Sequence, residues 1–447
     1  MTRRSFFFGL PLCTGIVAML LFACSSSDPS TLQPGDADSG SGDGGVAEVD
    51  AAAPEDAGTE AGPFTEPPPY DFSVACSSAP CVTQIAARGG AHVCALLQDG
   101  SVRCWGSNAS GQLGTGGDAS SMPGFAASPQ AVAGVTGAKS IAATGKDTSG
   151  TTCVVSTTGT VSCFGSDASG HLGRPDAGAY AGPNPVPAPV DGLQARSVTL
   201  ANTFALAIGA DDLLWSWGAN DTHQLGRAGE GSVEAAARAE RLTGVVRSCA
   251  GTSTTAFALT EQGEVLSWGG ATEEQLGRTT SLVRDPSPSP IALTEVSSIA
   301  TGDAHACALR RGRVYCWGSN EDGQLGTGRK AAEWYPAEVA FPETVYAVAV
   351  AAGGNDTCVI ASAGDVWCWG ANGSGQVGAP PGADRPMPTP IAGLGEQAVG
   401  LAVMDDTICA LLRSGVVTCW GDNRVGQLGR GSRDAELHPA PAPVVFP

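Results

Sequence analysis

The chain has 447 residues, with 44 acidic and 24 basic side chains and a formal net charge of −20. This sign excludes binding to nucleic acid by counterion release. Glycine (62 residues) and proline (30) are abundant, while charged residues make up only 15%. Such a composition favours a turn-rich all-β protein over a helical one.

The N-terminus has the pattern of an export signal. Arg3 and Arg4 precede a mostly apolar run over residues 6–23, which predicts a signal peptide over residues 1–23, with an uncleaved membrane anchor as the alternative. The run ends in Leu-Phe-Ala-Cys, which resembles a bacterial lipobox with Cys24 as the lipidated residue. The arginine pair also resembles a twin-arginine signal, so this route and general secretion both stay open.

An acidic segment follows. Residues 25–72 contain eleven Asp or Glu and no Lys or Arg, and large apolar side chains are few. Such a segment buries too little surface to offset its ordering entropy, and its like charges repel. We therefore predict that residues 24–72 are a lipidated, disordered acidic linker, and that the folded part spans residues 73–447.

Two short signatures repeat in phase through the folded part. A Trp-Gly or Phe-Gly pair begins at residues 105, 164, 217, 268, 317, 369 and 420, with spacings of 49 to 59 residues. Six residues after each pair begins a Gly-Gln-Leu-Gly-like corner. A unit of about 50 residues accommodates four short strands. We expect the small-residue runs, such as residues 141–145, to lie nearest the axis and the tryptophans to pack between units.

The paired signatures resemble the regulator-of-chromosome-condensation repeat family over residues 82–447. This resemblance implies one seven-bladed β-propeller. The nuclear members exchange guanine nucleotides and bind chromatin, which the export signal and acidic charge oppose here. The plant ultraviolet photoreceptor uses tryptophans of a Gly-Trp-Arg-His-Thr repeat, whose positions fall at Gly90 and Asp303 in this chain. Secreted bacterial members include a propeller-type β-lactamase inhibitor, although no residue here identifies that target.

The chain ends suggest how the ring closes. The first unit begins with a small-residue run at residues 85–87 and has no Pro-Val strand before it. Residues 441–445 supply such a strand at the C-terminus. We therefore expect residues 439–447 to pair with the first unit.

The cysteines follow the repeat. Five pairs bracket predicted hairpins, with spacings of ten residues, or of nine where the turn is shorter, so that the partners face each other. These pairs are Cys94 with Cys104, Cys153 with Cys163, Cys307 with Cys316, Cys358 with Cys368, and Cys409 with Cys419. Two units lack both members. We predict five hairpin disulfides and a sixth between Cys76 and Cys81, with reduced buried thiols as the alternative. Such disulfides indicate an oxidising compartment, and Cys249 is expected to be a buried, inert thiol.

No motif for catalysis is present. The chain has no nucleophile elbow, phosphate loop or metalloprotease helix motif, and its histidines recur with the repeat, which favours structural roles. We therefore expect no catalytic residue, no metal and no cofactor. The leading hypothesis is a non-enzymatic, protein-binding propeller. An envelope enzyme with a site at the channel mouth, and a purely structural envelope scaffold, are the alternatives.

The candidate binding residues lie in a loop between a corner and the following Pro-rich strand. This loop contains Arg329, Lys330, Trp334 and Tyr335, of residue types favoured as anchors at interfaces. The alternative is that the two aromatic rings pack on the propeller itself. We expect a monomer, exported and lipid-anchored to the cell envelope. It would bind an unidentified protein, contact the membrane through the lipid alone, and bind no nucleic acid.

Overall fold

The computed structural model describes residues 69–76, 79–174, 182–229 and 232–447. Within these residues the regular structure is all β-strand apart from one 3-10 turn, η1 (Ala119–Ser121). No helix in this part of the chain is long and apolar enough to span a bilayer. The predicted signal peptide, Cys24 and residues 24–68 of the predicted linker lie outside the described residues.

The strands form seven successive antiparallel groups of four, which we call blades 1–7. Blade 1 contains β1 (Val82–Ala86), β2 (His92–Leu97), β3 (Val102–Ser107) and β4 (Phe125–Ala131). Blades 2 and 3 contain β5 (Ala138–Lys146), β6 (Ser149–Ser156), β7 (Thr160–Gly165), β8 (Asn184–Leu200), β9 (Phe204–Gly209), β10 (Leu214–Ala219) and β11 (Val233–Arg238). Blade 4 contains β12 (Val246–Gly251), β13 (Thr255–Thr260), β14 (Val265–Gly270) and β15 (Arg284–Pro290).

The remaining blades repeat this order. Blade 5 contains β16 (Val296–Thr301), β17 (His305–Arg310), β18 (Arg313–Gly318) and β19 (Glu333–Glu338). Blade 6 contains β20 (Ala347–Gly353), β21 (Asp356–Ala361), β22 (Val366–Gly370) and β23 (Arg385–Pro390). Blade 7 contains β24 (Ala398–Val403), β25 (Thr407–Leu412), β26 (Val417–Gly421) and β27 (His438–Pro443).

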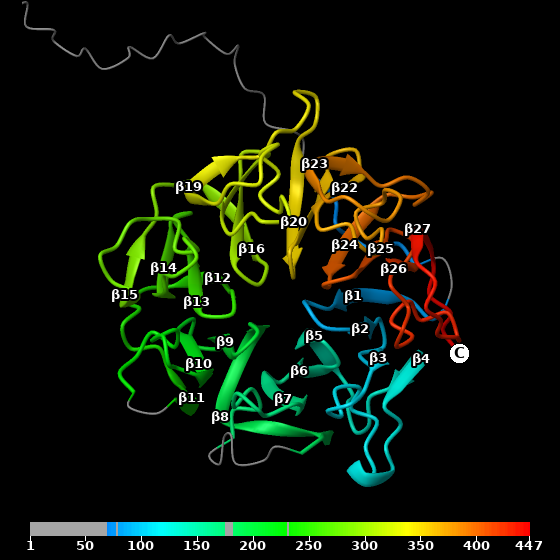
Figure 1. Ribbon diagram of the computed structural model, residues 1–447. Helices are drawn as coiled ribbons and strands as arrows, with labels where there is room; N and C mark the ends of the chain where they lie inside the picture. Colours follow the sequence, from blue (N-terminus) through cyan, green and yellow to red (C-terminus); the bar gives the residue numbers. More distant parts are fainter. Residues whose placement is uncertain (1–68, 77–78, 175–181, 230–231) are drawn as a thin grey trace, which may run out of the picture. The chain divides into compact units, whose positions relative to one another are not determined.

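Blades 2 and 3 share one long strand. The first half of β8 pairs with β7, and its second half pairs with β9. Figure 1 shows the blades side by side around a centre, with the first strand of each blade innermost. The predicted all-β, seven-bladed propeller is therefore confirmed, and so is the position of the small-residue runs.

Antiparallel connectivity gives the propeller two different faces. The loops between first and second strands and between third and fourth strands lie at one end of each blade, which we call the corner face. The turns between second and third strands, and the connections between blades, lie at the other end, which we call the hairpin face. Residues 327–332 therefore lie on the corner face.

An indole hydrogen bond joins each blade to its neighbour at six of the seven interfaces. The Nε1–H of the repeat tryptophan donates to the main-chain oxygen of the Gln or His in the corner of the preceding blade. The six bonds are Trp105–Gln427, Trp217–His171, Trp268–Gln224, Trp317–Gln275, Trp369–Gln324 and Trp420–Gln376, at 2.6–3.0 Å. All six indoles are completely buried. The tryptophans therefore pack between blades, as the sequence predicts.

The last glycine of the corner makes room for this contact. Gly326 has a φ of 68°, and a Cβ atom there would lie 2.7 Å from Nε1 of Trp369. Any larger residue would therefore push the indole away from the carbonyl of Gln324. This close approach explains why the Trp-Gly and Gly-Gln-Leu-Gly signatures occur together.

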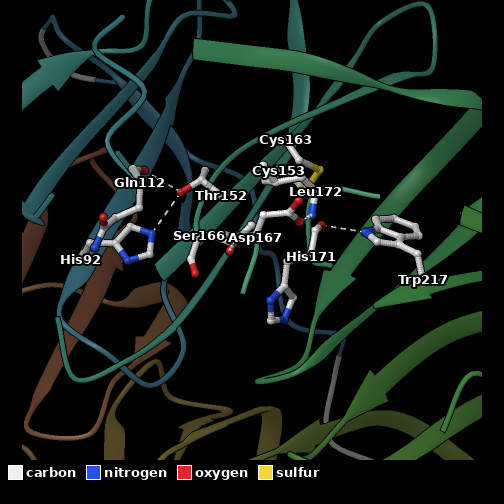
Figure 2. Close-up of a disulfide and its surroundings, with 11 residues drawn as sticks. His92, Gln112, Thr152, Cys153, Cys163, Ser166, Asp167, His171, Leu172 and Trp217 are labelled. Atoms are coloured by element: carbon white, nitrogen blue, oxygen red, sulfur yellow. Dashed lines mark hydrogen bonds between the residues drawn. A yellow bond between two sulfur atoms is a disulfide. The ribbon is translucent and has the colours of Figure 1, made fainter. Parts of the chain in front are cut away.

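The interface between blades 1 and 2 uses a different donor. Blade 2 carries Phe164, which has no N–H, at the tryptophan position. Instead, the hydroxyl of Thr152 donates to the main-chain oxygen of Gln112 at 2.8 Å (Figure 2). The corner carbonyl therefore keeps a hydrogen-bond donor despite the loss of the indole.

The C-terminal strand does not pair with the first blade, so that prediction is wrong. β27 pairs with β26 as the fourth strand of blade 7, and blade 1 has its own fourth strand, β4. The Pro-rich strand ends each unit instead of preceding it, so no strand is missing from blade 1. The first and last blades are joined by Trp105, whose Nε1 donates to Gln427 and whose ring meets Phe446 edge-on at 5.9 Å.

The chain before β1 also spans this junction, on the hairpin face. The Tyr70 hydroxyl donates to the main-chain oxygen of Ala398 at 2.8 Å, and Arg413 binds both the carboxylate and the main-chain oxygen of Asp71. The N–H of Ala75 donates to the oxygen of Arg413 at 2.7 Å. Residues 70 and 71, which the sequence analysis assigns to the linker, therefore contact blade 7.

The two different interfaces give a matched prediction. Thr152→Val removes the hydroxyl that donates a hydrogen bond to the Gln112 carbonyl. Thr357→Val removes the equivalent hydroxyl, but the Gln324 carbonyl still accepts a hydrogen bond from the indole of Trp369. Both variants lose the bond to a histidine. We expect Thr152→Val to lower the unfolding free energy by roughly 1–2 kcal/mol more than Thr357→Val, because a buried acceptor loses its donor. Denaturant titration measures both, and equal losses would contradict the compensation.

Candidate functional site

Five hairpins place cysteines directly opposite each other. The register pairs Cys94 with Cys104 and Cys358 with Cys368, and the same holds in blades 2, 5 and 7. In the structure all five pairs are disulfide-bonded, with Cα atoms 4.1 Å apart. This spacing corresponds to the close, non-hydrogen-bonded type of cross-strand pair. These sites lie in the blade cores, so their role is structural.

Two further cysteine predictions concern the chain before the first blade and the lone thiol. Cys76 and Cys81 are bonded in the structure, as in the sequence prediction. Cys249 is the free cysteine of the described residues, and it is buried. Burial raises the pKa of this thiol to about 11, so Cys249 is protonated near neutral pH and is a poor nucleophile.

The repeat histidines are internal hydrogen-bonding groups. The Thr152 hydroxyl donates to Gln112, so it accepts from Nε2–H of His92 at 3.0 Å (Figure 2). His305 of blade 5 makes the same contact with Thr357 of blade 6. Burial lowers the pKa of His92, His171 and His305 to about 4. These groups stay neutral at physiological pH, which favours the structural roles expected from the sequence.

Arg88 fills the centre of the corner face. It follows β1, and its guanidinium reaches blades 3 and 5 on other sides of the ring. Nε donates to the oxygen of Thr301 at 2.8 Å, and Nη2 donates to that of Gly302 at 2.7 Å. Nη1 lies 3.3 Å from both the Leu200 oxygen and the side-chain oxygen of Asn202. One arginine therefore ties three blades together at the axis.

Carboxylates lie around this arginine. Asp303 accepts from Asn202 at 2.6 Å, and Asp405 accepts from the N–H of Gly90 at 3.3 Å. Burial, together with smaller effects of the neighbouring carboxylates of Asp303 and Asp406, raises the pKa of Asp405 to about 7. Asp405 therefore titrates near neutral pH, at the junction between the first and last blades.

A cavity of 290 Å³ opens beside Asp405. It is also lined by Asp147, Asp406, Asp422 and Arg424. In the described part of the chain no three His, Cys, Asp or Glu side chains are arranged to hold a metal ion. Asp422 is already engaged by Nε of Arg424 at 2.7 Å and by Gln427. The cavity therefore has acidic walls, without a metal-binding cluster among the described residues.

The candidate binding residues lie at the rim of the corner face. Trp334 and Tyr335 are 50% and 52% exposed at the start of β19, so about half of each side chain is accessible to solvent. Lys330 forms a 2.6 Å ion pair with Asp384 of blade 6, and Arg329 lies 3.6 Å from Glu333. The four predicted residues are thus brought together in one strip of blade 5, with the aromatic pair open to solvent.

The next blade extends this strip. Met387 occupies the position in β23 that Tyr335 occupies in β19, and it is 53% exposed. A Cβ atom on Gly328, in the blade 5 loop, would lie 3.6 Å from its Cγ. Met387 is not among the predicted residues because it stands within a Pro-rich strand, and only its equivalence to Tyr335 in the repeat points to it.

Asp405 gives a pH-dependent prediction. Its folded pKa is raised above the usual 3.8, so the folded protein holds the proton more tightly than the unfolded chain. Stability is therefore lost as pH rises from about 4 to about 7. Asp405→Asn keeps an acceptor for Gly90 without the charge, and we expect it to raise unfolding free energy by roughly 1–3 kcal/mol at pH 8. Thermal unfolding from pH 4.5 to 8 measures this, and a gain independent of pH would contradict the burial of this charge.

Models of the regulator of chromosome condensation (RCC1) repeat match the chain in several blades. One matches residues 262–309, 311–360 and 363–405, and another with the same description matches residues 82–112, 296–324 and 347–376. The E3 ubiquitin-protein ligase HERC2 of Mus musculus is 31% identical over 228 residues, which are 49% of this chain and 5% of HERC2. The ultraviolet-B receptor UVR8 of Arabidopsis thaliana is 28% identical over 251 residues, covering 54% of this chain and 56% of UVR8. The chain thus matches only part of each relative.

Solved structures share the fold. Human WBSCR16 has a TM-score of 0.68 at 23% identity, covering 78% of this chain and 95% of that protein. Prp20p of Saccharomyces cerevisiae has a TM-score of 0.66 at 19% identity, covering 84% of this chain and 88% of that protein. The chain therefore contains RCC1 repeats in the matched segments, and it has the fold of the RCC1-type β-propellers.

Proposed function

We propose that this protein is a non-enzymatic binding propeller, exported and tethered to the cell envelope through Cys24, with the corner face presented to a protein partner. The observation that carries the proposal is the exposed aromatic pair Trp334–Tyr335 on a rigid blade. Half-exposed Trp and Tyr side chains lose little conformational entropy on docking, and such residues are enriched among interface anchors.

The path of the chain supports this choice of face. Tyr70 and Asp71 bind the propeller on the hairpin face, at Ala398 and Arg413. A tether that precedes residue 69 would therefore join the propeller on that side. The loops of the corner face, including residues 327–332, lie at the opposite end of the blades.

Proteins of this fold are known with bound partners, and their names describe diverse activities. A yeast propeller of this type, Prp20, has been solved with Kap60 bound. HERC2 is named a ligase and UVR8 a receptor. The aligned stretch covers 5% of HERC2, so the ligase activity is not transferred to this chain.

The enzyme alternative receives less support from the geometry. At the corner-face mouth the Arg88 guanidinium is engaged with Thr301, Gly302 and Leu200, where a channel enzyme would need its reactive groups open to substrate. Asp405 has a raised pKa there but hydrogen-bonds to the main chain of Gly90. A purely structural scaffold would need no exposed aromatic pair. The exposure of Trp334 and Tyr335 therefore favours a binding protein over a scaffold.

The aromatic pair gives a direct test of binding. Trp334→Ala with Tyr335→Ala should reduce capture of envelope proteins by the immobilised full chain at least about tenfold, since each anchor contributes on the order of 1–2 kcal/mol. The matched control replaces Phe72 and Val245, exposed apolar residues of the hairpin face, and should leave capture unchanged. Equal capture by all three proteins, quantified by mass spectrometry, would rule out this surface.

Anchoring is tested separately. Cys24→Ala removes the only thiol on which the lipobox resemblance relies, and we expect it to move the protein from the membrane fraction to the soluble exported fraction. Metabolic labelling with a radioactive fatty acid should mark the native chain and not the variant. A variant that still sediments with membranes would favour the uncleaved anchor.

A further inference from the structure

The outer strand of a blade is a potential docking edge, because its free side carries main-chain donors and acceptors. Each fourth strand pairs with only one neighbour in its sheet. Unprotected edges of this kind can accept an added strand, and proteins commonly block them with proline. The seven outer strands can therefore be compared for their proline content.

Six of the seven outer strands contain at least one proline. β15, β23 and β27 and the outer half of β8 carry three prolines each, and β4 and β19 carry one each. β11, with the sequence Val-Glu-Ala-Ala-Ala-Arg, carries none. All seven strands lie within the described residues, so blade 3 is the exception in this ring.

The register shows which main-chain group the prolines remove. Pro290, Pro390 and Pro443 stand opposite Leu266, Trp367 and Thr418, and Pro189 stands opposite Ser162 in the same place. The residue that follows this position, for example Ile291 or Ile391, donates its N–H to the inner strand. Because successive residues of a strand direct their main-chain groups to opposite sides, the proline nitrogen faces the free edge. In blade 3, the residue opposite Trp215 is Arg238. Ala239 donates its N–H to the inner strand, so the N–H of Arg238 points outward. Four other blades have no donor at this position, whereas blades 1 and 5 have Ala131 and Glu338 there but carry a proline elsewhere in the strand.

The side chains of β11 leave the edge accessible. Ala235, Ala236 and Ala237 are small and partly exposed. Glu234 is held by Arg227 at 3.1 Å, with 12% and 13% of the two side chains exposed. An approaching strand would therefore meet no large side chain along the middle of this edge.

The positive charge at the end of β11 indicates which side chain a bound strand should carry there. The Arg238 side chain is 55% exposed, and its ion pair with Asp211, also exposed, contributes little energy and can be exchanged. Arg241, three residues later, donates to the main-chain oxygen of Pro286 and retains its positive charge. This end of the edge therefore complements an acidic side chain.

We propose that the free edge of β11 binds an extended, proline-free segment of a partner protein, which adds to blade 3 as a further strand and places an acidic residue beside Arg238. This inference rests on the proposed protein-binding function and adds a second contact with a defined recognition mode. Main-chain hydrogen bonds would supply affinity and alternate side chains would supply specificity. The site lies on blade 3, so it can fail while the aromatic strip of blade 5 still binds.

The test uses a synthetic heptapeptide of alternating Thr and Val that ends in Asp, with fluorescence anisotropy for affinity and hydrogen exchange for location. The full chain should bind this peptide, and exchange should slow at least about tenfold in β11 but not in β19 or β23. Substituting proline at alternate peptide positions should abolish binding. No binding up to millimolar peptide, or protection of a different outer strand, would overturn the proposal.

Substitutions at Arg238 distinguish the contribution of its main-chain N–H to binding from that of its side-chain charge. Arg238→Pro restores the residue found in four other blades and should weaken binding at least about tenfold, whereas Arg238→Gln keeps the N–H and should weaken it about two- to fivefold. Ala131→Pro, at the same position of blade 1, is the matched control and should bind normally. Full affinity of Arg238→Pro would overturn the proposal. So would protection of β11 that depends on protein concentration without peptide, because a second copy would then be the occupant.

Discussion

The hydrogen bond from an indole N–H to a corner carbonyl is the constraint on which the ring depends. Each blade is a small four-stranded sheet that cannot bury both of its faces alone. Stacking it on the next blade buries them, and the indole fixes the relative position of the two sheets because the donor and acceptor must meet inside the packed interface. The same bond, from Trp105 to Gln427, joins the last blade to the first. Ring closure is thus one more copy of the repeat interaction.

Because the seven blades and their interfaces are so similar, a blade that departs from the pattern indicates a specific role for the departing residue. Phe164 removes one indole, and the Thr152 hydroxyl, which makes the same bond as Thr357 does beside the indole of Trp369, remains as a donor. At the axis, Arg88 departs from the repeat by reaching carbonyls of two distant blades. On the outside, β11 departs by lacking proline. The first two differences serve the ring itself, whereas the open edge and the exposed pair Trp334–Tyr335 have no such role and are the surfaces we assign to partners.

Local sequence patterns predicted the features that depend on local geometry. The number of blades and the hairpin cysteine pairs follow from spacing, because a turn of known length fixes which residues face each other, as Cys307 and Cys316 do. The pairing of the C-terminal strand was predicted wrongly because a Pro-rich strand was thought to be missing before residue 85, although β4 already completes blade 1 and β27 completes blade 7. Arg88 could not be found, since its partners lie 112 to 214 residues away. The exposure of Trp334 also depended on packing that spacing does not encode.

The most direct test of this account is the hydrogen-exchange rate of the tryptophan indole N–H groups, measured by NMR on the full chain. The account predicts that Trp105, Trp217, Trp268, Trp317, Trp369 and Trp420 form one slowly exchanging class, because all six donate to buried corner carbonyls. Trp334, half exposed, should exchange much faster. If Trp105 exchanged as fast as Trp334 while the other five stayed protected, the last blade would not be joined to the first by this bond, and the central claim would be contradicted.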